Sequence, residues 1–165
     1  MTDQSVLRAD SDFTAIYRRN FSRIYRIAYL KLGSRADAED AVQTVFLRFY
    51  RKGRAFDSPE HEKAYFLRAI HNECVSILRS PWRSRQDSFE DLLARDEPAA
   101  EDPDREVLRA VCSLPEKYRE LLCLFYYDGL TTREIARLLR RNESTIRGQL
   151  KTARALLKPI LQDQL

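Results

Sequence analysis

Apolar residues recur every three or four positions through most of this chain, as they do on the buried face of an α-helix. The chain contains only four glycines, and three of them, Gly33, Gly53 and Gly129, stand where such a pattern stops. Glycine readily adopts the left-handed backbone conformation with which many helices end. No stretch of four or more residues shows the alternation of a half-buried strand bounded by turns. The sequence therefore predicts an all-α protein.

Three helices are expected before residue 80. They cover about residues 13–32, 34–52 and 58–79. Ser34 can cap the second helix, and Ser58, which a proline follows, is a typical start for the third. Because the connections are short, the three helices should form one bundle.

Helical patterns resume after residue 103. The expected helices cover residues 104–114, 115–128, 131–139 and 142–158. Thr131 and Glu134 have the spacing of a capping box, and Asn142 is a good cap for the last helix. Pro159 should come just after the end of that helix, because proline cannot donate a backbone hydrogen bond.

An acidic stretch with prolines separates these two helical regions. Residues 84–104 hold eight acids against two bases, whereas residues 1–83 and 105–165 each carry a net charge of +5. We therefore expect two small helical domains, an N-terminal helix bundle and a C-terminal helix-turn-helix domain, joined by an acidic flexible linker. The stretch of about 25 residues from 80 to 104 could span at most roughly 80 Å. Two basic domains suggest two surfaces for a polyanion, and ordinary solvated faces are the alternative interpretation.

Other residue patterns exclude several classes of protein. No run of 18 apolar residues occurs and the N-terminal residues are polar, so we expect a cytoplasmic protein without membrane insertion. The three cysteines, Cys74, Cys112 and Cys123, form no CxxC pair, and we expect them to be core residues. No phosphate-binding loop and no nucleophile with an oriented base is recognisable, so we expect no enzyme activity, metal or cofactor.

The segment TTREIARLLRRNESTIRGQL, residues 131–150, has the pattern of a helix-turn-helix. If the apolar residues of its second helix face inward, the opposite face presents hydrogen-bonding side chains suited to the edges of bases in a major groove. Arg140 and Arg141 in the turn could reach phosphates. Glycine is common in such turns, so Arg140 would have to accept a left-handed backbone, or the first helix would have to end differently. A plain helical hairpin remains the alternative.

Four stretches of sequence carry a resemblance to a known family. They are SRADAEDAVQTVFLRFYRK, KAYFLRAIHNECVSILRS, LPEKYRELLCLFYYDGLTTREIARLL and ESTIRGQLKTARALL. In this order they resemble the bacterial sigma factors of the extracytoplasmic-function (ECF) group of the sigma-70 family, over about residues 12–83 and 104–161. The resemblance implies an alternative sigma factor for stress responses that acts as a monomer. It would bind the clamp and flap of core RNA polymerase, direct the polymerase to promoter DNA and be controlled by an anti-sigma factor.

The resemblance also implies roles for segments and residues. Residues 1–83 would bind polymerase and open the −10 element, residues 84–104 would form the linker, and residues 105–165 would read the −35 element. The residues on polymerase would be Asp37, Asp40, Gln43, Thr44 and Leu47. The residues on −10 DNA would be Phe56, Tyr65, Arg68 and Asn72. The residues on −35 DNA would be Arg140, Arg141, Ser144, Thr145, Arg147, Gly148 and Lys151.

Some positions depart from the family pattern or leave two interpretations open. Tyr65 stands where the family usually has tryptophan, and it keeps a ring that can stack on a base. Phe66 could face DNA or belong to the core. Gly148 and Gln149 replace a common serine and a common arginine, which changes the promoter sequence to be expected. The acidic linker could pass temporarily through the polymerase channel that later carries RNA, or it could be a solvated spacer.

Two other functions compete with the sigma factor. A stand-alone helix-turn-helix regulator would bind an operator without polymerase, but it leaves the first 83 residues without a role. If the protein were a helical adaptor without a DNA role, mutating Arg147 and Lys151 to alanine should leave promoter-dependent transcription unchanged.

Overall fold

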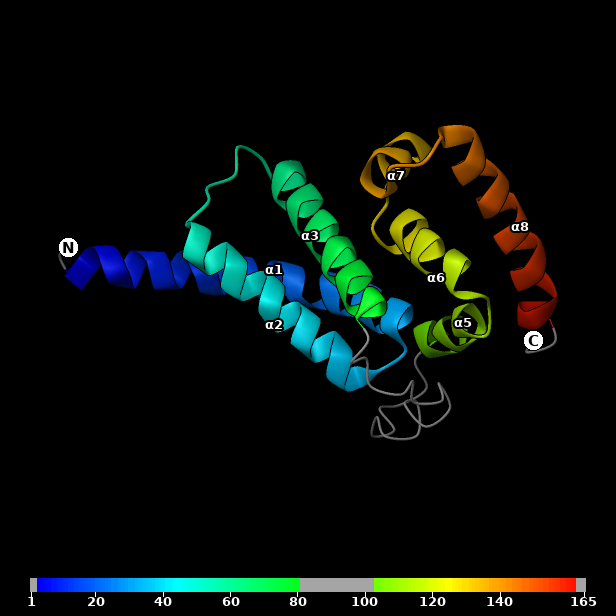
Figure 1. The fold of residues 1–165 in the computed structure, drawn as a ribbon, viewed down its shortest axis with the longest axis horizontal. Helices are drawn as coiled ribbons and strands as arrows, with labels where there is room; N and C mark the ends of the chain where they lie inside the picture. Colours follow the sequence, from blue (N-terminus) through cyan, green and yellow to red (C-terminus); the bar gives the residue numbers. More distant parts are fainter. Residues whose placement is uncertain (1–2, 81–102, 163–165) are drawn as a thin grey trace.

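The computed structural model describes residues 3–80 and 103–162, and every regular element in these ranges is a helix (Figure 1). The all-α fold predicted from the sequence is confirmed. Almost all of the predicted acidic linker lies outside the described residues. None of the described helices is long and apolar enough to cross a membrane.

The first domain is a bundle of three helices. They are α1 (Asp3–Leu32), α2 (Arg35–Lys52) and α3 (Pro59–Arg79). The Ser34 hydroxyl accepts a hydrogen bond from the Asp37 amide at 3.2 Å, and the Ser58 hydroxyl accepts one from the His61 amide at 3.1 Å. Both predicted caps are therefore present. α1 begins ten residues earlier than the apolar pattern indicated, at Asp3 rather than near residue 13.

The second domain follows with α5 (Pro103–Cys112), α6 (Glu116–Leu122), a π-helical turn η1 (Cys123–Tyr127), α7 (Thr132–Leu139) and α8 (Glu143–Gln162). The sequence predicted one uninterrupted helix over residues 115–128. Instead the Asp128 amide bonds to the Cys123 carbonyl five residues back, at 3.1 Å. A π-turn contains one more residue than an α-turn, so the residues after it rotate relative to the face of α6.

The connection between α7 and α8 is the turn of a helix-turn-helix. Thr131 and Glu134 form the predicted capping box, with hydrogen bonds of 3.2 and 2.7 Å. Arg140 adopts φ 54° and ψ 48°, and it is the only non-glycine residue with positive φ in the described part of the chain. Of the two alternatives left open, the left-handed arginine is the one that occurs. The Arg140 and Arg141 amides both bond to the Ala136 carbonyl, as in a glycine-ended helix.

Pro159 does not end the last helix, contrary to the prediction. α8 continues through Pro159 to Gln162. Pro159 cannot donate the backbone hydrogen bond to the residue four positions earlier, so packing must compensate for that loss. Ile160 packs against the core, which favours keeping the last turn helical.

The two domains lie against each other: α1 contacts α6, and α3 contacts α7 (Figure 1). Their buried apolar residues form one continuous cluster that includes Ile24, Phe66, Leu121 and Ile146. The sequence contained no signal for this contact.

Candidate nucleic-acid and polymerase interface

The outer face of α2 carries the residues that we predicted from the sequence to contact polymerase. Val42, Val45 and Phe46 turn into the core, which leaves the opposite face of the helix exposed. On that face Asp40, Gln43 and Leu47 are exposed, whereas Asp37 and Thr44 are half-buried. The Thr44 hydroxyl donates to the Asp40 carbonyl at 2.9 Å and so belongs partly to the helix itself.

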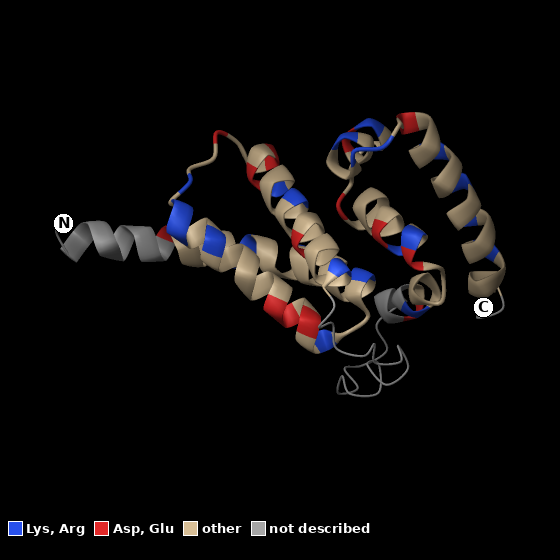
Figure 2. Ribbon diagram, viewed as in Figure 1, with Lys and Arg blue, Asp and Glu red and all other residues tan. Residues whose placement is uncertain are grey.

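The structure adds one residue to this face. Tyr50 lies one turn beyond Leu47, and each of the two side chains is 53% exposed. Two large apolar side chains that are each half exposed on adjacent turns are typical of a protein-binding surface, although one edge of the Tyr50 ring packs on Phe13. The three-residue spacing from Leu47 would have identified Tyr50 in the sequence. Figure 2 shows that the acidic residues gather near the start of α2, next to Arg35, and that the other basic residues lie toward its end.

A cationic hollow of about 440 Å³ lies along α3. Three of the four residues predicted to contact −10 DNA line it, namely Tyr65, Arg68 and Asn72. The hollow is also lined by Arg48, Lys52 and Arg54, and no carboxylate is among its lining residues. The Arg54 guanidinium lies 5.4 Å from the centre of the Tyr65 ring. We call this site the α3 hollow.

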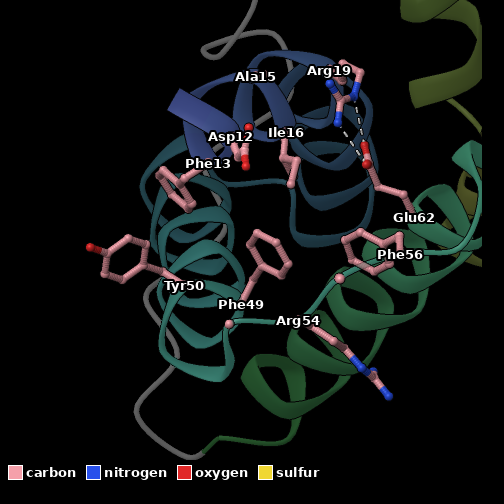
Figure 3. A pocket seen from close by; sticks show the side chains of 12 residues that line it. Asp12, Phe13, Ala15, Ile16, Arg19, Phe49, Tyr50, Arg54, Phe56 and Glu62 are labelled. Carbon is pink, nitrogen blue, oxygen red and sulfur yellow. Dashed lines mark hydrogen bonds and ion pairs between the residues drawn. The ribbon is translucent and has the colours of Figure 1, made fainter. Parts of the chain in front are cut away.

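Phe56, the fourth residue predicted to contact −10 DNA, lines a second hollow of about 500 Å³ at the end of the bundle. We call this site the aromatic hollow. In Figure 3 the rings of Phe13, Phe49 and Phe56 border it, while the Arg54 side chain points away. Arg54 lines both hollows, and the Phe56 and Tyr65 rings lie 5.3 Å apart, so the two hollows adjoin.

Glu62 places a fixed negative charge on the rim of the aromatic hollow (Figure 3). Its carboxylate accepts two hydrogen bonds from Arg19, at 2.9 and 3.1 Å, and one from the Asn20 amide at 2.7 Å. The hydrogen bonds from Arg19 outweigh the effect of burial and lower the pKa of Glu62. The carboxylate is therefore ionised at neutral pH.

The neighbouring Phe66 has no exposed surface. Of the two interpretations left open for it, the core position is the one that occurs. Phe66 packs against Phe49 and Phe56 from the core side, with its ring centre 5.2 Å from that of Phe49.

The exposed face of α8 presents the side chains predicted to read DNA. Ile146, Leu150 and Ala153 are buried. The exposed residues of α8 include Ser144, Thr145, Arg147, Gly148 and Lys151. This arrangement is that of a helix-turn-helix rather than a plain hairpin packed on both sides.

Two contacts on this face were not anticipated. Arg147 donates to the Glu143 carboxylate at 2.8 Å, although its side chain remains 68% exposed. Arg141 donates to Gln149 at 3.3 Å, so the residue that replaces the family's arginine orients a neighbouring arginine. Arg140 itself is exposed beside them.

The three cysteines are all buried, as the sequence predicted. Burial raises the pKa of Cys74 and of Cys112 to about 12, so these thiols stay protonated and unreactive.

An all-helical chain that joins a helix-turn-helix to a second domain with a cationic, aromatic surface has the makeup of a DNA-binding transcription protein. Comparison with known proteins narrows this class. The family model of sigma-70 region 2 matches residues 16–84, and that of sigma-70 region 4 matches residues 104–157. Because the two models together cover most of the chain, the protein belongs to the sigma-70 family.

Relatives place it in the ECF group. The chain is 27% identical over 159 residues to the ECF RNA polymerase sigma factor SigK of Mycobacterium tuberculosis, covering 90% of this chain and 85% of SigK. It is 28% identical over 157 residues to the ECF RNA polymerase sigma factor SigE of Mycolicibacterium smegmatis, covering 88% of this chain and 60% of SigE. The family resemblance and the function as a sigma factor, a protein that directs transcription initiation, are thereby confirmed. The sigma family is not a family of enzymes.

Two solved structures share the fold. The sigma factor RpoE of Bartonella quintana, crystallised with the anti-sigma factor NepR, matches with a TM-score of 0.69 and 20% identity, over 92% of this chain and 97% of RpoE. CnrH, solved in complex with the cytosolic domain of CnrY, matches with a TM-score of 0.63 and 22% identity, over 94% of this chain and 91% of CnrH. These likenesses support the two-domain helical fold.

Proposed function

We propose that the protein brings core RNA polymerase to promoters whose −10 element is bound by residues 1–83 and whose −35 element is bound by residues 105–165. It would act in the cytoplasm, under the control of an anti-sigma factor. The observation that carries the proposal is the pair of adjoining hollows on the first domain, one cationic and one aromatic.

The two hollows suit different parts of a single DNA strand. The α3 hollow, lined by Lys52, Arg54 and Arg68 and by Arg48, which is paired with Glu73, suits the phosphate backbone. The aromatic hollow suits an uncharged base, because aromatic rings border it and the Arg19 guanidinium on its rim is already paired with Glu62. Extruding a base costs a few kcal/mol, and stacking on an aromatic ring returns about 1–3 kcal/mol per base. One stacked base together with backbone contacts could therefore hold a short melted segment.

The second domain would read the −35 element with α8 in the major groove. Arg147 and Lys151 lie one turn apart on its exposed face, and each can contact guanine. Arg147 must leave Glu143 to do so. The cost is small because exposed ion pairs contribute about 0–1 kcal/mol. Arg140 and Arg141 would contact the phosphates beside the groove.

Polymerase would bind the outer face of α2. Asp40 and Gln43 supply polar contacts there, while the exposed halves of Leu47 and Tyr50 supply apolar area. A mixed surface of this kind is typical of an interface that forms and dissociates.

An anti-sigma factor could dock where the two domains meet. An apolar hollow of about 360 Å³ lies there, lined by Leu30 of the first domain and by Val111, Tyr126 and Leu157 of the second, among others. The anti-sigma complex of the Bartonella quintana relative supports a partner of this kind.

Promoter melting with purified components tests the proposal. Promoter DNA carrying 2-aminopurine in the non-template strand of the −10 element should gain fluorescence when this protein and core polymerase are added together. Phe56→Ala should abolish most of the gain while leaving core affinity unchanged, and Phe56→Tyr, which keeps the ring, should retain it. Tight, specific DNA binding that needs no polymerase would instead favour a stand-alone regulator.

A further inference from the structure

Glu143 is the only acidic residue of α8, and it stands on the helix face that we propose reads DNA. Glu143, Arg147 and Lys151 follow one another at intervals of four residues, so their side chains project from the same face. Arg147 and Lys151 are the two proposed contacts to guanine. The N-terminal residues of a recognition helix usually contact base edges. A carboxylate at this point of a surface for a polyanion therefore requires a physical reason.

Two donors bind the same oxygen of the Glu143 carboxylate. The hydroxyl of Thr132, in the first turn of α7, donates to Oε1 at 2.9 Å, and Arg147 donates to Oε1 at 2.8 Å. The hydrogen bond from Thr132 lowers the pKa of Glu143, so the carboxylate is ionised at neutral pH. No side chain in the described part of the chain donates to Oε2. This oxygen can therefore accept a hydrogen bond from a ligand.

The two donors differ in how firmly they stay beside Glu143. Thr132 begins α7 and is half-buried, so its short side chain keeps its place. The Arg147 side chain is 68% exposed, and it would turn away from Glu143 to contact guanine. The carboxylate then keeps one hydroxyl donor while it lies among phosphates. A base that offers a donor would replace the hydrogen bond that Arg147 gave up.

The four bases differ in what they offer a carboxylate in the major groove. Cytosine presents its N4 amine, which is a donor, whereas guanine presents the acceptors N7 and O6 and thymine presents the acceptor O4. Adenine presents an amine directly beside the acceptor N7, so it attracts and repels a carboxylate at once. Cytosine is therefore the base that best suits ionised Glu143.

We infer that Glu143 reads a cytosine of the −35 element, and that Thr132 is the positioning residue that holds its carboxylate while Arg147 contacts guanine. This inference rests on the proposed function of the second domain. Residues four apart in a helix are separated by about 6 Å along its axis, and successive base pairs by about 3.4 Å. The cytosine should therefore lie within about two base pairs of the guanine that Arg147 contacts.

A purely structural role for Glu143 makes a different prediction. An acid in the first turn of a helix, paired with a cation four residues on, stabilises that helix. Loss of such a role would weaken binding to every −35 sequence alike. Loss of a reading role would instead change the preference at one base pair and leave the other preferences in place.

Base preference along the −35 element tests the inference. Holoenzyme made from core polymerase and the full chain is bound to promoter duplexes in which each −35 position is varied in turn, and relative affinities are measured by competition. The parent protein should prefer cytosine at one position by about 10-fold. Glu143→Ala should remove this preference and keep the guanine preference due to Arg147. Glu143→Gln should change the preferred base from cytosine to adenine, because an amide side chain pairs with adenine N6 and N7.

Two further variants separate positioning from charge. Thr132→Val removes the hydroxyl but keeps the size of the side chain, so the cytosine preference should shrink while the guanine preference stays. Glu116→Gln removes one exposed carboxylate from α6 of the same domain and should leave every base preference unchanged. Circular dichroism confirms that each variant keeps the helicity of the parent protein.

The outcomes distinguish the inference from the proposed function. If the holoenzyme selects a −35 element but Glu143→Ala and Glu143→Gln keep the parent's cytosine preference, or lose affinity for all sequences alike, the reading role of Glu143 is overturned. If only Thr132→Val leaves the cytosine preference unchanged, Thr132 does not position the carboxylate. A parent holoenzyme that selects no −35 element would refute the proposed function of the second domain, and this inference with it.

Discussion

Arg140→Gly separates the structural cost of the helix-turn-helix turn from its role in binding DNA. Arg140 holds φ 54° and ψ 48°, a conformation that costs a non-glycine residue about 1–2 kcal/mol. Glycine removes this strain but loses roughly 0.4–1 kcal/mol through the greater freedom of the unfolded chain. The net gain in the free energy of unfolding should be about 0.5–1 kcal/mol. For a chain of this size that corresponds to a rise in Tm of roughly 2 °C.

The same substitution should weaken binding to promoter DNA. Each phosphate contact contributes about 0.9 to the slope of log K against log salt concentration, so losing one contact should reduce the slope by about that amount. Calorimetry measures the change in stability. Fluorescence anisotropy of a −35 duplex with holoenzyme, between 50 and 300 mM salt, measures the change in the salt dependence of binding. Arg140→Lys is the matched control, because it keeps both the strain and the charge.

The reasoning fails in two recognisable ways. If Arg140→Gly lowers Tm, the arginine side chain stabilises the turn by packing and the strain argument is wrong. If Tm rises but the salt slope equals that of the parent protein, Arg140 does not contact phosphate.

Three further substitutions probe the other surfaces. Asp40→Ala should weaken binding to core polymerase without loss of helicity, and equal affinity by titration would remove Asp40 from that interface. Gly148→Ser should raise the free energy of unfolding by about 0.5 kcal/mol, because a Cβ there meets nothing within 4 Å and serine favours a helix more than glycine does; a lower Tm would contradict this. Asp128→Asn should abolish an increase in the free energy of unfolding between pH 7 and pH 5, measured by chemical denaturation. Burial raises the pKa of Asp128 to about 6, so protonation favours the folded state as pH falls through that value; an unaltered pH profile in the variant would contradict this.

Local signals in the sequence predicted most of the helix boundaries. The three glycines at pattern ends all have positive φ, at 63°, 59° and 66°, and the caps at Ser34, Ser58 and Thr131 all form. These features act over a few residues, so the local sequence specifies them. The π-turn at Cys123 and the continuation of α8 past Pro159 depend on packing by distant residues. Local rules therefore predicted both incorrectly.

In the candidate site, too, some features follow from local sequence and others depend on packing by distant residues. Exposed positions on α2 and α8 follow from helix periodicity once the buried face is known. The division of the −10 residues between two hollows does not, because it depends on how the segment between α2 and α3 folds over the end of the bundle. Phe56 and Tyr65 are nine positions apart in the sequence, and only the structure shows their rings in contact.

The interface between domains was invisible in the sequence for a further reason. Glu120 pairs with Lys31, 89 residues away, and in isolation each looks like an ordinary charged helix residue. The structure also shows that the two buried acids of the second domain act in opposite directions. Glu120 has a lowered pKa, so its ionised form stabilises the folded state, and this contribution is lost only as pH falls through that lowered pKa.

Asp128 has a pKa raised to about 6 from 3.8 by burial, which the charges of Arg23, Lys63 and Arg26 only partly offset. Ionised Asp128 therefore destabilises the folded state by about 3 kcal/mol at neutral pH, at roughly 1.4 kcal/mol per pKa unit. This cost opposes the contribution of Glu120, and the apolar cluster that both domains share supplies the packing that holds them together.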